Sequence, residues 1–315
     1  MTPPALGELL GGATALVLDG GLSNQLADQG CDLSDALWTA RLLAEAPEQI
    51  TAAHTAYVRV GARVLITASY QATYEGFARR GLGRAEASAL LRRSVELARQ
   101  AAGGPRVRVA ASVGPYGAML ADGSEYRGRY GKSVRELERF HRPRIETLAS
   151  AGPDVLALES VPDADEAEAM LAAAEGAGVP VWLSYTIEGD RTRAGQPLAD
   201  AFALAAGRDE VVAVGVNCCA PADVEGAVRL AAEVTGKPVV AYPNSGEGWD
   251  AGGRRWQGGA TFDPALAIRW QAAGARLIGG CCRVGPDTVA AIAAALREDG
   301  PPPGRAGEGE SILRG

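Results

Sequence analysis

Short apolar runs recur along the chain and alternate with longer segments in which apolar positions follow a helical period. Each run is continuous rather than alternating, which is typical of strands buried on both faces of a parallel sheet. Eight runs predict strands: Ala15–Leu18, Val64–Ile66, Val107–Val113, Val155–Leu158, Val179–Tyr185, Val211–Val216, Pro238–Tyr242 and Arg276–Ile278.

The segments between these runs are amphipathic and rich in Ala, Leu and Glu, which predicts helices. Their ranges are Glu48–Gly61, Arg84–Ala102, Val134–Ala151, Asp163–Ala177, Leu198–Gly207, Ala222–Thr235, Pro264–Ala273 and Asp287–Glu298. Eight strands alternating with helices predict an α/β fold, a single-domain (β/α)8 barrel of the TIM type over residues 1–299. An open doubly wound sheet is the alternative. We expect residues 300–315 to form a flexible tail, and residues 114–132 and 244–263 to form ordered loops over one end of the barrel.

Composition narrows the possible partners. Hydrophobic residues make up 47% of the 315 residues, and the net charge is -7 with a pI of about 5.1. This charge argues against a nucleic-acid partner, and no apolar run is long enough to span a bilayer. The first residues lack the pattern of a signal peptide, so we expect a cytoplasmic protein that acts on small molecules. The oligomeric state stays open.

Polar and thiol side chains stand where the predicted strands end. In a barrel, the carboxyl ends of the strands form the rim that carries the active site. We therefore expect the residues at these ends to lie close together. The ends are Asp19–Gly21, Thr67–Ser69, Gly114–Tyr116, Glu159–Ser160, Asn217–Cys219, Pro243–Ser245 and Gly279–Cys282.

Four of the five cysteines form two adjacent pairs, Cys218–Cys219 and Cys281–Cys282, at two of these ends. Clustered thiols in a reducing compartment indicate a metal or catalysis rather than disulfides. Three thiolates in one place suit Zn²⁺, and a site with three protein ligands leaves a fourth position for water or substrate. A thiol substrate bound there would be deprotonated, so no histidine base is required.

Seven motifs at these ends resemble the homocysteine S-methyltransferase family. The pairing of VGVNC with IGGCCRVGP is highly specific, and two of the loop motifs most resemble the branch that uses S-methylmethionine. The motifs are LDGGLSNQL (18–26), ITASYQAT (66–73), SVGPYGAMLADGSEYRGRYG (112–131), LALESVPD (156–163), VGVNC (214–218), YPNSGEGWD (242–250) and IGGCCRVGP (278–286).

The resemblance implies a role for each matching residue. It implies zinc held by the catalytic residues Cys218, Cys281 and Cys282. It implies that Asp19 and Glu159 bind the amino group of homocysteine. It further implies that backbone amides of Gly20, Gly21 and Leu22 bind its carboxylate, that Thr67 shapes this pocket, and that Asn217 packs beside the metal. Tyr242, water and Asn217 remain candidates for the fourth resting ligand.

The expected reaction is attack of the zinc-activated homocysteine thiolate on the methyl group of S-methylmethionine or S-adenosylmethionine, giving methionine. Aromatic loop residues could hold the sulfonium by cation–π contact; the candidates are Tyr116, Tyr126, Trp249 and Trp256. A betaine-type enzyme, or one using another methyl donor of the same family, is an alternative.

Two further alternatives lie outside the family. A Schiff-base lyase needs a lysine at a strand's carboxyl end, and the chain has only Lys132 and Lys237. The second is a non-enzymatic structural zinc or redox-thiol protein, which Cys219 as a fourth ligand would support. We interpret Cys219 as a buried core residue. His54 lies on an apolar helical face, so we interpret it as a core residue too.

Overall fold

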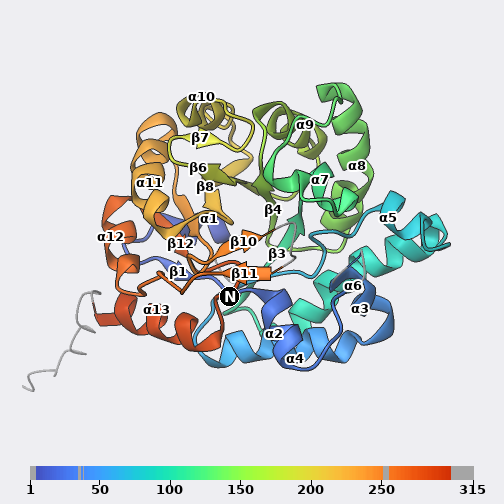
Figure 1. The fold of residues 1–315 in the computed structure, drawn as a ribbon, viewed down its shortest axis with the longest axis horizontal. Helices are drawn as coiled ribbons and strands as arrows, with labels where there is room; N and C mark the ends of the chain where they lie inside the picture. Colours follow the sequence, from blue (N-terminus) through green and yellow to red (C-terminus); the bar gives the residue numbers. More distant parts are fainter. Residues whose placement is uncertain (1–4, 35–36, 38, 251–254, 299–315) are drawn as a thin grey trace, which may run out of the picture.

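Eight parallel strands form a closed barrel in the computed structural model (Figure 1). The structure describes residues 5–34, 37, 39–250 and 255–298, and for residues 248–250, 255–256 and 298 the backbone alone. Hydrogen bonds join the strands in the order β1-β12-β9-β8-β5-β4-β3-β2, and a parallel bridge between Leu18 and Val64 closes the ring. The strands are β1 (Leu16–Val17), β2 (Val64–Ile66), β3 (Arg108–Val113), β4 (Val155–Val161), β5 (Val181–Tyr185), β8 (Val211–Asn217), β9 (Val239–Tyr242) and β12 (Ala275–Ile278).

Helices surround the strands, as Figure 1 shows. Each predicted helix is present, and its ends shift by a few residues. The helices are α4 (Pro47–Arg59), α6 (Arg84–Ala102), α8 (Val134–Ser150), α9 (Ala164–Ala174), α10 (Leu198–Ala203), α11 (Pro221–Thr235), α12 (Leu266–Ala273) and α13 (Pro286–Glu298). The predicted (β/α)8 barrel is therefore confirmed, and the open doubly wound sheet is wrong.

Two apolar clusters stabilise the barrel. The larger lies between the strands and the outer helices, and the smaller fills the inside of the ring. A short helix that the pattern did not predict, α1 (Leu6–Leu10), contributes Leu6 and Leu10 to the inner cluster, where they join Leu18 and Trp182. The inner space is thus packed with side chains rather than open, as in other barrels of this type.

Most of the additional short elements follow the carboxyl ends of strands. Helices α2 (Leu22–Asp28) and α3 (Thr39–Glu45) come after β1, and α5 (Tyr74–Ala78) comes after β2. The predicted loop after β3 contains α7 (Tyr116–Leu120) and a 3-10 turn, η1 (Ser124–Tyr126). Two hairpins complete this end: β6 (Ile187–Glu188) with β7 (Arg191–Thr192), and β10 (Gly248–Asp250) with β11 (Arg255–Gln257).

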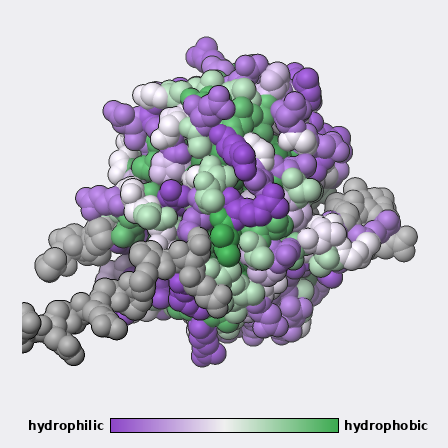
Figure 2. Space-filling model, turned by 90° about the vertical axis from the view of Figure 1, so that its left-hand side faces the viewer, coloured by the Kyte–Doolittle hydropathy of each residue, from purple (hydrophilic) through white to green (hydrophobic). Residues whose placement is uncertain are grey.

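Hydrophilic side chains cover much of the face shown in Figure 2, with hydrophobic ones scattered among them. Within the described part of the chain, no helix combines the length and apolar character needed to cross a membrane. The proposed tail at 300–315 lies outside the described residues, so the boundary at residue 299 stays a prediction.

Candidate active site

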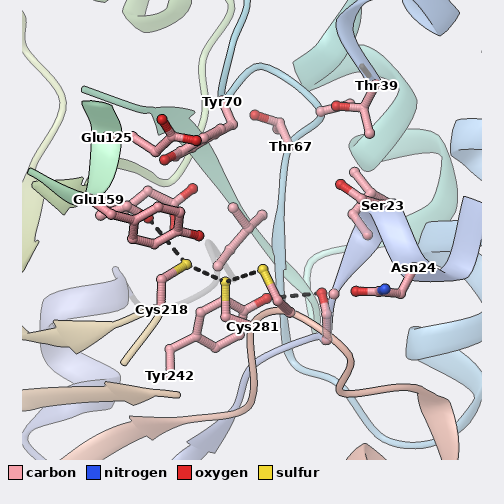
Figure 3. A pocket seen from close by; sticks show the side chains of 18 residues that line it. Ser23, Asn24, Thr39, Thr67, Tyr70, Glu125, Glu159, Cys218, Tyr242 and Cys281 are labelled. Atoms are coloured by element: carbon pink, nitrogen blue, oxygen red, sulfur yellow. Dashed lines mark hydrogen bonds between the residues drawn. The ribbon is translucent and has the colours of Figure 1, made fainter. Parts of the chain in front are cut away.

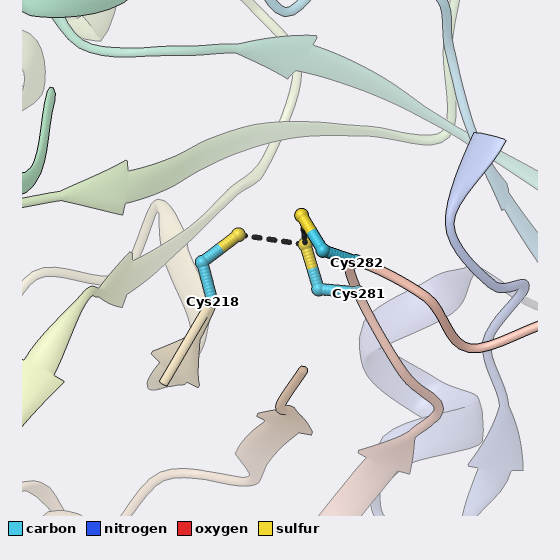
Figure 4. A group of neighbouring side chains, drawn as sticks. All are labelled: Cys218, Cys281 and Cys282. Atoms are coloured by element: carbon cyan, nitrogen blue, oxygen red, sulfur yellow. Dashed lines mark hydrogen bonds between the residues drawn. The ribbon is translucent and has the colours of Figure 1, made fainter. Parts of the chain in front are cut away.

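Three cysteines meet at the carboxyl end of the barrel (Figure 4). Cys218 follows β8, and Cys281 and Cys282 follow β12; both strands pair with β9, which brings their ends together. The three Sγ atoms lie within 4.8 Å of one another. Cys281 and Cys282 have their sulfurs 3.9 Å apart, close to the separation of about 3.8 Å for two thiolates on one tetrahedral zinc. The sulfurs of Cys218 and Cys281 are only 2.6 Å apart, so a shared metal would require this pair to separate.

Asn217 fixes the backbone that aims Cys218. Its side-chain amide donates to the Ser160 hydroxyl at 2.6 Å, and its carbonyl oxygen accepts from the Ser160 amide at 2.7 Å and from the Ser184 hydroxyl at 2.8 Å. Cys218 and Ser160 adopt φ values of 51° and 56°. This left-handed region is costly for residues other than glycine, and such strain gathers at functional sites.

Two glycines allow β12 to end close beside β1. A Cβ on Gly279 would lie 2.7 Å from the carbonyl oxygen of Asp19, and one on Gly280 would lie 2.4 Å from the Val284 side chain. Real Cβ atoms do not approach backbone this closely, so any larger residue at Gly279 would push Cys281 away from its present position.

A cavity opens above the sulfurs and extends between two walls (Figure 3). Glu125 and Tyr70 lie on one side, above Cys218, and Ser23, Asn24 and Thr39 lie on the other. Its empty space, including the open mouth, is about 750 Å³. The lining residues are Gly20, Gly21, Leu22, Ser23, Asn24, Thr39, Ile66, Thr67, Ala68, Tyr70, Glu125, Tyr126, Glu159, Ser160, Cys218, Tyr242, Cys281 and Cys282.

Glu159 brings a buried carboxylate to this cavity. Its side chain is only 5% exposed and accepts a hydrogen bond from the Ser112 hydroxyl. Burial raises the pKa of Glu159 to about 8, although the Ser112 hydrogen bond opposes the shift. Thr67 stands nearby, where its hydroxyl lies 2.7 Å from the Ser69 hydroxyl and accepts from the Ser112 amide at 3.0 Å. Within the described part of the chain, no basic side chain forms an ion pair with Glu159, so its carboxylate lacks the positive partner that would favour the charged form.

Asp19 is placed differently from Glu159, because it does not line the cavity. It is fully buried, and its carboxylate accepts hydrogen bonds from the Ile66 amide at 2.8 Å and from the Tyr242 hydroxyl at 3.0 Å. Burial raises the pKa of Asp19 well above its usual value, and these two hydrogen bonds oppose the shift. Tyr242 lines the cavity, so Asp19 is connected to the cavity through its hydrogen bond with Tyr242.

Several other predicted site residues also have protein partners. Asn217 does not line the cavity but lies beneath Cys218, with its amide nitrogen 3.4 Å from the Cys218 sulfur. Gly20, Gly21 and Leu22 line the cavity. The Gly21 amide already donates to the Val284 carbonyl at 2.9 Å, so it is not available to a ligand in this arrangement.

The aromatic candidates separate into three groups. Tyr126 lines the cavity, whereas Tyr116 packs against Tyr130 and Phe140 with ring centroids 5.3 and 4.8 Å away. The side chains of Trp249 and Trp256 lie outside the described residues. Of these four, Tyr126 is thus the one that the structure places at the cavity.

The three cysteines of the cluster interact with one another. Hydrogen bonds with Cys218 and Cys281, and then with Tyr126, lower the pKa of Cys282 well below its usual value. Among the described residues, the group of potential metal ligands at this place contains three cysteines, and Cys219 is not one of them. Cys219 is buried in the apolar core, as predicted.

The wall residues Ser23, Asn24, Thr39, Tyr70 and Glu125 were not predicted as site residues. Tyr70 follows β2, and Glu125 belongs to the loop after β3. Their position after strand ends was a usable signal, because every segment that follows a strand reaches the same rim. Thr39 is farther from its strand, and nothing in the pattern indicated it.

The fold and the site together define a class of enzyme. In this class a (β/α)8 barrel carries a cluster of potential metal-binding cysteines at the carboxyl ends of its strands. Residues 16–296 match the family model described as homocysteine S-methyltransferase. The chain belongs to the homocysteine S-methyltransferase family, and it is a methyltransferase, as the sequence motifs predicted.

Curated relatives match the sequence of this chain along nearly its whole length. Homocysteine S-methyltransferase 4 of Zea mays is 47% identical over 305 residues, covering 90% of this chain and 89% of that protein. Homocysteine S-methyltransferase of Escherichia coli is 47% identical over 304 residues, covering 92% and 97%. The crystal structure of the Escherichia coli homocysteine methyltransferase MmuM in a metallated form superimposes with a TM-score of 0.81 at 45% identity, covering 91% of this chain and 98% of that one.

Proposed function

We propose that this protein transfers a methyl group from a sulfonium donor, S-methylmethionine or S-adenosylmethionine, to the thiol of homocysteine. The convergence of Cys218, Cys281 and Cys282 beneath this cavity supports the proposal in a chain of this family. The homocysteine sulfur forms a bond to the methyl carbon while the bond between that carbon and the donor sulfur breaks. The breaking bond leaves its electron pair on the donor sulfur, which departs as a neutral thioether, and the thiol proton passes to water.

We propose zinc as the metal. Cys218, Cys281 and Cys282 would hold it, because soft thiolate ligands suit zinc and three protein ligands leave one position for a substrate. When bound, zinc would keep a coordinated homocysteine thiol deprotonated at neutral pH. A reducing location such as the cytoplasm, which we also propose, would keep the three thiols free of disulfides.

The cavity suggests how homocysteine is held. We propose that Glu159 receives its ammonium group, since a cation beside this buried carboxylate would restore the charged form that burial disfavours. Asp19 would strengthen this attraction from behind Tyr242. The amides of Gly20 and Leu22 would bind the carboxylate, Thr67 would shape the wall beside Glu159, and Asn217 would hold Cys218 in position.

The lysines do not favour the lyase alternative. Lys237 precedes β9 and donates to the Arg208 carbonyl at 2.8 Å, at the opposite end of that strand from the cavity. Lys132 is paired with Glu136 at 3.3 Å on an exposed surface. Neither lines the cavity. Betaine remains a donor to test beside the sulfonium compounds.

The direct test uses purified, reduced, zinc-loaded protein with homocysteine and each donor in turn. We expect methionine with S-methylmethionine, and no methionine from any donor would overturn the proposal. Cys282→Ser is expected to lose both zinc and activity. Cys31→Ser, which changes a half-buried cysteine outside the cluster, is the matched control and should keep both. A Cys282→Ser variant without zinc but with full activity would contradict the proposed role of the metal.

A further inference from the structure

Glu125 brings a second buried carboxylate to the wall of the cavity. It is 7% exposed, and its Oε2 atom has no hydrogen-bond partner among the residues that the structure describes. Among the described residues, no basic side chain forms an ion pair with it. The nearest candidate in its own loop, Arg127, instead reaches Asp122 at 4.0 Å, on the exposed side of that loop. A carboxylate kept away from water and cations is costly unless a ligand supplies the missing charge.

The loop that carries Glu125 is built to hold it in this place. A Cβ on Gly117 would lie 2.5 Å from the Glu125 amide nitrogen and 2.7 Å from the Ser124 carbonyl carbon, so α7 and η1 touch through backbone alone. The side chain of Asp122 accepts from the Ser124 amide at 2.9 Å and secures the turn. The position of Glu125 is therefore set by backbone packing.

Two tyrosines stand beside Glu125. Tyr70 and Tyr126 are half-buried and line the same cavity. The ring of Tyr70 packs over Gly114, where a Cβ would lie 2.7 Å from it. Figure 3 shows Tyr70 and Glu125 together above Cys218. Aromatic faces attract cations, and a nearby carboxylate adds to that attraction.

We propose that Glu125, Tyr70 and Tyr126 form the subsite for the positive sulfonium of the methyl donor, and that Glu125 selects charged donors over neutral ones. This proposal depends on the proposed methyl transfer. The subsite lies above the cysteine cluster, so a donor held there can present its methyl group to a thiol bound below. The opposite wall, with Ser23, Asn24 and Thr39, would remain for the polar parts of the substrates.

The charge of Glu125 would act on binding rather than on the chemical step. The donor sulfur is positive before transfer and neutral afterwards, so the attraction is strongest in the bound donor and weaker in the transition state. An interaction of this kind lowers KM without raising kcat. It also disappears when the neutral thioether forms, which favours release of the product over release of unreacted donor.

The test compares Glu125→Gln with the wild type in zinc-loaded protein without homocysteine. Calorimetry gives the Kd of S-methylmethionine and of its neutral analogue, in which carbon replaces the sulfonium sulfur. We expect S-methylmethionine to bind about ten- to a hundredfold more weakly to Glu125→Gln, the usual cost of losing a charged partner. Binding of the neutral analogue should not change. Glu188→Gln, which removes one charge from an exposed position in the β6–β7 hairpin, is the control and should bind both as the wild type does.

Kinetics and a second variant complete the test. Glu125→Gln should raise the KM of the donor, leave the homocysteine KM unchanged and not lower kcat. Tyr70→Leu, which keeps the carboxylate, should weaken sulfonium binding about three- to thirtyfold, as expected for a desolvated cation–π contact. Wild-type methyl transfer with unchanged sulfonium affinity in both variants would overturn the subsite alone. No methyl transfer by the wild type with any donor would instead overturn the proposed function, and the subsite with it.

Discussion

The hydroxyl of Tyr242 donates a hydrogen bond to Oδ1 of Asp19 at 3.0 Å and also lies 2.9 Å from the carbonyl oxygen of Gly20. This contact joins the end of β9 to the end of β1, across the intervening strand β12. It also occupies the hydroxyl of Tyr242, one of the candidates for a fourth metal ligand. Tyr242 is therefore better placed to orient Asp19 than to bind a metal.

Tyr242→Phe should raise the KM of homocysteine about tenfold, since Asp19 loses a hydrogen bond that favours its charged form. The zinc content should stay the same. Tyr185→Phe is the matched control: Tyr185 is also buried, and its hydroxyl donates to the Ala201 carbonyl at 2.8 Å, away from the cavity. It should lose similar stability with no change in KM. Loss of zinc in Tyr242→Phe, measured by elemental analysis, would show that Tyr242 is a ligand after all.

Gly279→Ala should weaken metal binding, because the new methyl group would meet the Asp19 carbonyl oxygen at 2.7 Å and displace Cys281. We expect the affinity for zinc to fall about ten- to a hundredfold, the effect usual for disturbed support of a metal ligand. Competition with a chelator measures it.

Gly226→Ala is the control for this substitution. Gly226 lies within α11, and an added Cβ there meets no atom within 4 Å. That change should leave zinc affinity alone and stabilise the fold by about 0.5–1 kcal/mol. Equal zinc affinities in the two variants would mean that the close approach at Gly279 does not position Cys281.

The barrel and the cysteine cluster could be predicted because they depend on local patterns. Continuous apolar runs indicated all eight strands, and each strand's carboxyl end is reached simply by following the chain. Cys218 and Cys281 could therefore be placed at one rim although 63 residues separate them. That these thiols bind one metal ion together stays a prediction.

The cavity walls could not be predicted in the same way. Elements such as α7 and η1 are too short to show a hydrophobic period. The orientation of Asp19 depends on Tyr242, which is 223 residues away, and no local pattern reports such a contact. The hydrogen bond from the Gly21 amide to the Val284 carbonyl is likewise a contact between distant residues that no local pattern predicts. The local sequence decides which residue stands at a strand end. The direction of its side chain depends on tertiary contacts with distant parts of the chain.

The two histidines, His54 and His141, are both fully buried but differ in their partners. Arg144 donates to Nδ1 of His141 at 2.8 Å, so Nε2 carries the proton and donates to Glu166 at 2.9 Å. Glu166 also accepts from the Tyr116 amide, at the start of α7. For His54, neither ring nitrogen has a hydrogen-bond partner among the described residues.

His141→Leu should therefore destabilise the fold by about 3–5 kcal/mol, because it leaves Arg144 and Glu166 buried without their shared partner. His54→Leu should change stability little at pH 7, since it removes no hydrogen bond and keeps the site filled. Urea unfolding of both variants at pH 7 makes the comparison. Equal losses of stability in the two variants would show that the hydrogen bonds that link Arg144, His141 and Glu166 contribute nothing beyond packing.

Acid should destabilise the protein through the same two histidines. Burial lowers the pKa of His54 to about 4, and burial together with Arg144 lowers that of His141 to about 4. In the unfolded chain each binds a proton below about pH 6.5. Between these values the unfolded state holds more protons, so the free energy of unfolding falls as the pH falls, by about 1.4 kcal/mol per histidine per pH unit.

His54→Leu isolates one of these two contributions. Between pH 6.5 and pH 4, the free energy of unfolding of this variant should fall less steeply with acid than that of the wild type. The difference in slope should be about 1.4 kcal/mol per pH unit, which corresponds to one proton. Both proteins are measured with a chelator present, so that release of metal in acid does not enter the comparison. Above pH 7 the two curves should run parallel. Curves that stay parallel down to pH 4 would mean that His54 is protonated in the folded protein as readily as in the unfolded chain, and that its burial does not suppress its charge.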